Sequence, residues 1–83
     1  MQVGVQFTGT LQGNQTAQWF THSWNPDWHV IWTFVPVTVR TGAPEIEWSV
    51  ASERATSGVT YWLTVRNLTP TPVDFEGRYA IVN

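Results

Sequence analysis

Apolar and polar residues alternate along most of this chain. In the opening segment Val3, Val5 and Phe7 alternate with glycine and polar residues, which is the period of a strand that buries one face. No segment shows the spacing of an amphipathic helix. The pattern predicts an all-β fold whose first strand runs from about Gln2 to Leu11.

Turn-forming residues bound the second strand. Gly13-Asn14 has the chemistry of a hairpin turn, and it predicts that the first strand forms a hairpin with a strand from about Thr16 to Ser23. The segment Trp24-Asn25-Pro26-Asp27 ends this second strand, because proline has no amide hydrogen to donate and restricts the residue before it.

The third strand is expected to begin near Trp28. From there to Arg40 the residues are almost all β-branched or aromatic, which is typical of a central strand covered on both faces. Pro36 interrupts the run, so we expect a bulge or a change of sheet there.

Three more alternating segments follow, separated by a turn at residues 55–58 and a proline-containing loop at residues 67–72. Their expected core positions are Ile46, Trp48 and Val50, then Val59, Tyr61, Leu63 and Val65, then Val73, Phe75, Gly77, Tyr79 and Ile81. About six short strands separated by turns predict a compact antiparallel β-sandwich that forms a single domain over residues 1–83.

The composition changes this picture in one respect. The 83 residues include 6 tryptophans and no cysteine, so the domain has large apolar side chains but neither disulfides nor thiolate zinc sites. A chain of this size is marginally stable alone, and only 12% of its residues are charged. We therefore expect a homo-oligomer.

The charge pattern makes several partners improbable. The net charge is −2, lysine is absent, and the four arginines are scattered, whereas nucleic-acid binding requires a basic patch. No apolar run approaches the length of a membrane span or a signal peptide. The cytoplasm is the default location, although a fragment of a larger secreted protein would have the same composition.

The strongest candidate for a ligand site is the turn from Trp24 to His29. Trp24 and Trp28 could stack on a sugar, while Asn25, Asp27 and His29 could bind its hydroxyl groups. In the alternative, the two indoles cap the core and the polar side chains satisfy the backbone of the turn.

Other chemistry has weaker support in the sequence. His22, Asp27 and His29 do not have the spacing of a metal site, and no cofactor is expected. Two of the carboxylates, Glu45 and Glu47, fall on one strand face, where they would face arginines such as Arg66 or Arg78 on neighbouring strands. We predict that the protein is not an enzyme.

A candidate interface lies on the strand that contains Trp62 and Arg66. Both residues alternate with the expected core positions, and exposed tryptophan and arginine are enriched at protein interfaces. Alternatively, this strand lies between two layers and Trp62 is part of the core. The next residues, Asn67-Leu68-Thr69, match the acceptor pattern for N-glycosylation, a short pattern that often arises by chance.

The chain resembles the H-type lectins in the spacing of its strands. The matching stretches are Val5-Gln6, Trp24 with Pro26 and Val30, the turn at Gly58, and the ending Arg78-Tyr79-Ala80-Ile81-Val82. The resemblance implies a six-stranded sandwich, a trimer and binding of N-acetylgalactosamine. The aromatic residue and histidine with which that family holds sugar are not matched, because this chain has Arg66, Asn67 and Leu68 in the comparable region.

Two functions follow as hypotheses. In the first, the chain is a non-catalytic, carbohydrate-binding module that is multivalent because it oligomerises. In the second, it is a structural module that assembles through aromatic faces and has no small ligand.

Overall fold

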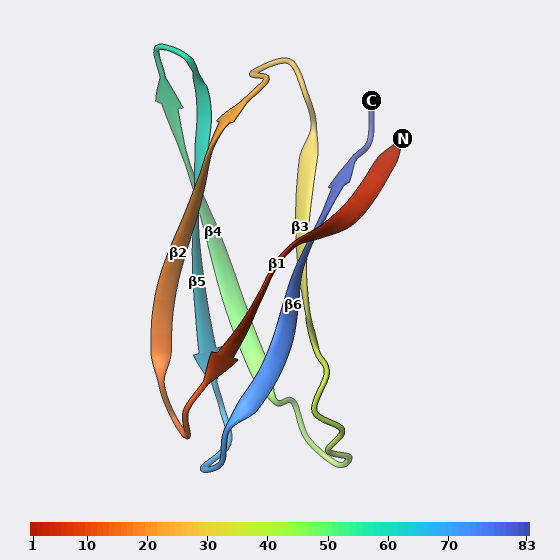
Figure 1. Cartoon of the computed structure of the whole chain (residues 1–83), viewed down its shortest axis with the longest axis vertical. Coiled ribbons are helices and arrows are strands. Elements are labelled where there is room, and N and C mark those ends of the chain that lie inside the picture. The colour runs from red at the N-terminus through yellow and green to blue at the C-terminus, as the bar shows by residue number, and fades with distance from the viewer.

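The computed structural model describes residues 1–83, which form six strands in two three-stranded sheets. Sheet A has the order β1 (Gln2–Leu11), β6 (Val73–Ile81), β3 (Val30–Pro36), and sheet B has the order β2 (Thr16–Trp24), β5 (Gly58–Asn67), β4 (Ile46–Ala55) (Figure 1). Every pair of neighbouring strands is antiparallel. The predicted all-β sandwich of about six strands is confirmed. The structure contains no helix that is long and apolar enough to cross a bilayer.

The turn at Gly13-Asn14 does not form the predicted hairpin. β1 pairs with β6 and β2 pairs with β5, so the turn carries the chain from one sheet to the other. Its backbone bonds the connection between β5 and β6, because the Asn14 amide donates to the Thr69 carbonyl and the Asn67 amide donates to the Gln15 carbonyl. A turn sequence reverses the chain direction, but it does not decide whether the flanking strands pair.

The third strand is an edge strand rather than the predicted central one. It begins at Val30, and its only partner is β6. Trp32 and Phe34 are buried between the sheets, whereas Ile31 is 54% exposed on the outer face. The almost continuous run of β-branched and aromatic residues therefore did not reveal that buried and exposed positions alternate along this strand. The prediction of a change of sheet near Pro36 is correct, since β3 ends there and the chain continues into β4 of sheet B.

A bulge in β1 reverses which side chains face inward. The pairing with β6 shifts between Val5 and Phe7. Beyond the shift Phe7 packs inside, in ring contact with Trp19, Phe34 and Phe75. Before the shift Val3 and Val5 lie exposed on the outer face of sheet A. Strict alternation through Val3, Val5 and Phe7, as the sequence suggests, is thus broken by one extra residue.

The core lies between the central strands β5 and β6. Its buried residues are Leu11, Trp32, Phe34, Ile46, Leu63, Val65, Val73 and Phe75. Gly77 of β6 is surrounded by aromatic rings, because a Cβ atom at this position would stand 2.6 Å from the Phe7 ring and 3.0 Å from the Phe34 ring. Glycine here lets both rings lie against the backbone of the central strand.

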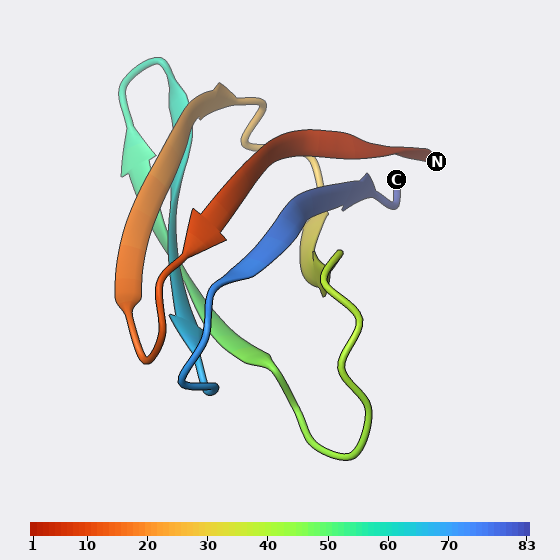
Figure 2. The same cartoon turned by 60° about the horizontal axis from the view of Figure 1, so that its bottom comes forward.

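Two polar side chains fasten the end of the sandwich at which β1 and β5 finish. The Asn67 side chain is fully buried, and its amide nitrogen donates to the carbonyls of Leu11, Gln12 and Thr71. Arg40 lies in the loop of residues 37–45 that swings out after β3 (Figure 2), and its guanidinium donates to Thr69 Oγ1. The polar residues from Asn67 to Thr71 therefore stabilise this end of the sandwich.

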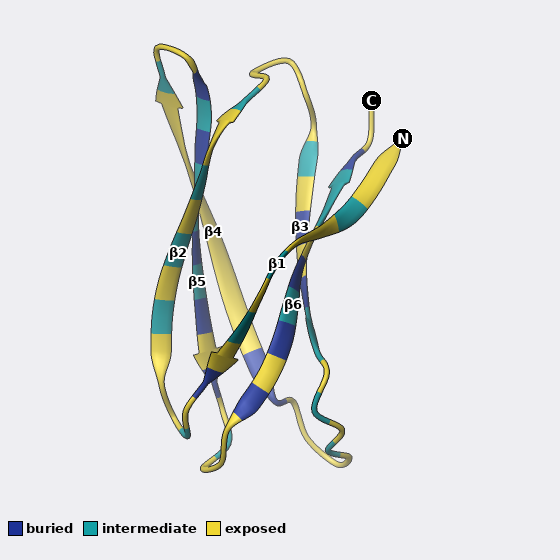
Figure 3. Cartoon of the chain, in the orientation of Figure 1, coloured by how far each residue is buried: buried dark blue, intermediate teal, exposed yellow.

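β4 is the least covered strand of the sandwich, although one of its rings contacts β3 of the other sheet. Figure 3 shows β4 exposed along nearly its whole length, while its neighbour β5 is largely covered. Trp48 and Val50 of β4 point toward the space between the sheets, as do their partners Val65 and Leu63 on β5. The Trp48 ring contacts Phe34 of β3 at a centroid distance of 5.6 Å, yet Trp48 and Val50 remain 40% and 42% exposed, so sheet A covers them only in part.

Candidate functional site

Most side chains of the predicted site at residues 24–29 make contacts within the fold. The Trp24 ring is half-buried and contacts the rings of Trp32, Tyr61 and Tyr79 at centroid distances of 5.5, 6.1 and 5.4 Å. Its indole nitrogen donates to Thr21 Oγ1. Trp24 therefore has little free ring surface on which a ligand could stack.

Most polar groups of this loop also have partners. Asn25 Oδ1 accepts from the amide of Asp27, which makes an Asx turn. The side chain of Asn83 binds the far end of the loop: its oxygen accepts from the His29 amide and contacts His29 Nδ1, and its nitrogen donates to the Asp27 carbonyl. Trp28 remains 40% exposed, so it is the aromatic side chain of this loop that a ligand could reach.

A second group of side chains lies on the outer face of sheet B, the surface turned away from sheet A. The pairing registers place them in rows across β2, β5 and β4. The rows are Thr16, Arg66 and Glu47; then Gln18, Thr64 and Ser49; then Phe20, Trp62 and Ala51. Because these side chains stand on paired strands, their spacing is held by the ladder hydrogen bonds.

The aromatic row carries the most exposed ring of this face. The centroids of Phe20 and Trp62 are 5.1 Å apart with an angle of 33° between the rings. Phe20 is 60% exposed and Trp62 is half-buried. The Trp62 indole nitrogen donates to Glu53 Oε1 at 3.0 Å, which fixes the plane of the indole. Trp62 thus lies on the outside, as one of the two readings of its strand expected.

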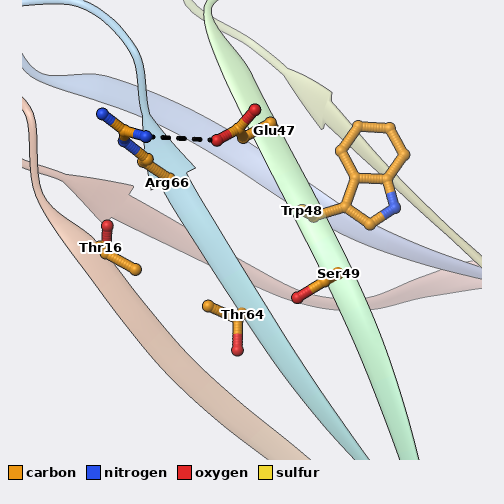
Figure 4. Close-up of a pocket in the computed structure, with 6 residues that line it drawn as sticks. All are labelled: Thr16, Glu47, Trp48, Ser49, Thr64 and Arg66. Atoms are coloured by element: carbon orange, nitrogen blue, oxygen red, sulfur yellow. Dashed lines mark hydrogen bonds and ion pairs between the residues drawn. The ribbon is translucent and has the colours of Figure 1, made fainter.

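The polar rows form a shallow hollow of about 280 Å³ beside the aromatic row (Figure 4). Arg66 and Glu47 form the predicted cross-strand ion pair at 3.5 Å, with both side chains more than half exposed. Thr16, Thr64 and Ser49, which contribute hydroxyl groups, and Trp48 complete the lining of the hollow. Gln18 Nε2 donates to Thr64 Oγ1 at 3.2 Å. The outer face of sheet B therefore offers hydroxyl, amide, carboxylate and guanidinium groups next to an exposed ring.

Sequence reasoning did not single out Phe20, although a signal was present. Trp19 and Phe20 are adjacent in a strand, and adjacent strand residues point to opposite faces. One of the two rings therefore had to lie outside. Trp19 is inside, in contact with Phe7 and Phe75, and Phe20 is outside.

The acidic and histidine side chains do not form a metal site. No group of three or more histidine, aspartate or glutamate side chains lies close enough to hold a metal ion. Glu45 and Glu47 are separated by burial, since Glu45 lies buried before β4 and accepts from the Arg40 amide, while Glu47 is exposed.

Comparison of the chain with protein-family models, with curated proteins and with solved structures finds no match.

Proposed function

We propose that this protein is a non-catalytic, carbohydrate-binding module and that the outer face of sheet B is its binding surface. The observation that carries this proposal is the exposed ring of Phe20 beside Trp62, with polar side chains in the adjacent rows. A pyranose presents an apolar C–H face and a rim of hydroxyl groups, so it needs a ring to stack on and hydrogen-bonding groups around that ring.

The rigidity of the surface supports this assignment. Phe20 and Trp62 stand on paired strands, and the indole nitrogen of Trp62 is held by Glu53. A surface that is already ordered loses little conformational entropy when a ligand binds. By comparison, the loop at residues 24–29 offers Trp28 alone, because Trp24 is enclosed by other rings.

The charges of the face favour a neutral glycan. Arg66 is paired with Glu47, and Glu53 accepts from Trp62. The three charges of this surface sum to −1, so it has no surplus of cations for a sulfated or sialylated sugar. Gln18, Thr64 and Ser49 supply uncharged donors and acceptors for hydroxyl groups.

A glycan-array screen of the purified protein tests the proposal, followed by calorimetric titration of the strongest neutral hit. We expect Phe20→Ala to weaken binding at least about fivefold, since a stacked ring contributes on the order of 1 kcal/mol or more. Trp28→Ala is the matched control, because it removes a partly exposed ring from a different surface. We expect it to bind as the unaltered protein does.

Two results would overturn the proposal in different ways. Loss of binding in Trp28→Ala with full binding in Phe20→Ala would move the site to the loop at residues 24–29. A folded protein that binds no glycan would favour the structural module, in which the aromatic residues serve only core and assembly.

A further inference from the structure

The four edge strands of the two sheets differ in how well they could accept another strand. β1 is interrupted by its bulge between Val5 and Phe7. β2 has a register shift between Thr21 and Trp24, with Ser23 at a φ of 66°. β3 has only 7 residues and ends at a proline. Bulges, short strands and proline all hinder the addition of a strand to a sheet edge.

β4 has none of these features. Its 10 residues pair with β5 in one unbroken register from Ile46 to Ala55, without glycine or proline. No backbone hydrogen bond from another part of the chain reaches its other edge. The small side chains of Ser49, Ala51 and Ser52 also leave room for a neighbouring strand. A long and regular open edge is a template for strand pairing.

The side chains beside this edge are incompletely covered. Trp48 and Val50 point toward the interior but keep 40% and 42% of their surface exposed. A strand placed against β4 would bring its own inward side chains next to these two. A strand with alternating apolar residues could therefore both pair with the open edge of β4 and cover Trp48 and Val50.

We propose that β4 pairs antiparallel with β4 of a second copy of this chain, with the two-fold axis at Ala51, to form a continuous six-stranded sheet. The charges of the strand select both the partner and the register. An axis at Ala51 places Trp48 opposite Arg54 and Ser49 opposite Glu53, and each pairing occurs twice because the contact is symmetric. A guanidinium beside an indole face is a favourable cation–π contact.

The neighbouring registers that keep the same faces together are poorer. An axis at Ser52 would pair only residues 49–55 of β4 and would place Trp48 opposite Thr56, beyond the end of the strand. An axis at Val50 would place Glu47 opposite Glu53 in both halves, and like charges directly opposite are destabilising. An axis at Ser49 would place Arg54 opposite Pro44, which has no amide hydrogen to donate. With the axis at Ala51, residues 47–55 of both copies are paired and all of them belong to β4.

This dimer also has a consequence for ligand binding, and that consequence rests on the proposed function. A two-fold axis perpendicular to a sheet keeps the same face of both copies on the same side. The Phe20 and Trp62 rows of the two copies would then lie on one continuous surface, and one dimer could bind two sugars of the same glycan or cell surface.

The test is the oligomeric state, which does not depend on any glycan. Sedimentation velocity over about a hundredfold range of concentration should show a reversible monomer–dimer equilibrium. Ala51→Glu and Ala51→Lys each place like charges opposite one another on the axis, so each variant alone should be monomeric. An equimolar mixture should dimerise again, because the opposed charges are then complementary.

Ile31→Glu is the matched control, since it adds a charge at an exposed position on the outer face of sheet A; it should dimerise as the unaltered protein does. Arg54→Ala should weaken the dimer several-fold. If Arg54 instead guards the edge as an inward-pointing charge, Arg54→Ala would dimerise more tightly, and the proposal would be wrong. A monomer at every concentration, a trimer, or dimers in both Ala51 variants would each overturn it as well. Circular dichroism of each variant establishes that it is folded.

Discussion

The two faces of β5 show how differently adjacent residues of one strand are used. Inward, Leu63, Val65 and Asn67 are fully buried, and they contribute apolar contacts and a side-chain amide that binds three carbonyls. Outward, Trp62 and Arg66 remain partly or largely open and contact side chains of neighbouring strands.

This difference separates the stability of the fold from its function. The fully buried inward residues of β5 have no surface left for a ligand. Residues on the outer face are held in position by the same strand, yet they retain polar atoms and ring surface. Substitutions along β5 should therefore affect stability on the inner face and binding on the outer face.

The largest effect on stability is expected for Leu63→Ala. Leu63 is fully buried between the sheets, and removal of its side chain leaves a cavity that should cost about 3 kcal/mol of unfolding free energy. Urea denaturation followed by tryptophan fluorescence measures this loss. A loss no greater than that of an outer-face variant would contradict the assignment of Leu63 to the core.

Asn67→Ala should have the next largest effect. It leaves the carbonyls of Leu11, Gln12 and Thr71 without their donor, which should cost about 2 kcal/mol. Asn67→Asp is an informative control, because it keeps the oxygen that accepts from the Thr69 amide but lacks the donors. We expect it to be nearly as unstable in the same denaturation experiment. Wild-type stability in Asn67→Asp would show that the three carbonyls do not need this donor.

Trp62→Ala should lower stability less than Asn67→Ala does, but it should have a larger effect on binding. The substitution removes a half-buried ring and its contact with Phe20, and it should lower the unfolding free energy by about 1 kcal/mol. The same substitution should abolish glycan binding by titration if the outer face of sheet B is the site. Unchanged affinity in a folded Trp62→Ala protein would exclude this row from the site.

Arg66→Ala should have the smallest effect on stability. Its ion pair with Glu47 is exposed to solvent on both sides, so its loss should change the unfolding free energy by less than about 0.5 kcal/mol. Glu47→Ala is the matched control and should behave similarly. A loss above that size in either variant, measured by urea denaturation, would show that the ion pair is stronger than an exposed pair normally is.

Parts of the candidate site were predictable from the sequence, and parts were not. The alternation around Trp62 predicted that its side chain lies on the other face of the strand from Leu63 and Val65, and the structure agrees. The loop at residues 24–29 was predicted as a ligand site because its residue types suit a sugar. The hydrogen bonds of this loop could not be predicted, however, since Asn83 lies 54 positions from His29 along the chain and contacts it only in the folded sandwich.

The strands and their approximate bounds follow from the sequence, because the period of alternation and the turn residues act locally. The sequence also determines which face of β5 is apolar, because neighbouring strand residues point in opposite directions. Only the folded arrangement shows that Gly13-Asn14 joins two sheets, that β3 is an edge strand, and that most of β4 is exposed. Those features depend on which strands pair, and strand pairing joins residues far apart in the chain, so no local pattern encodes it.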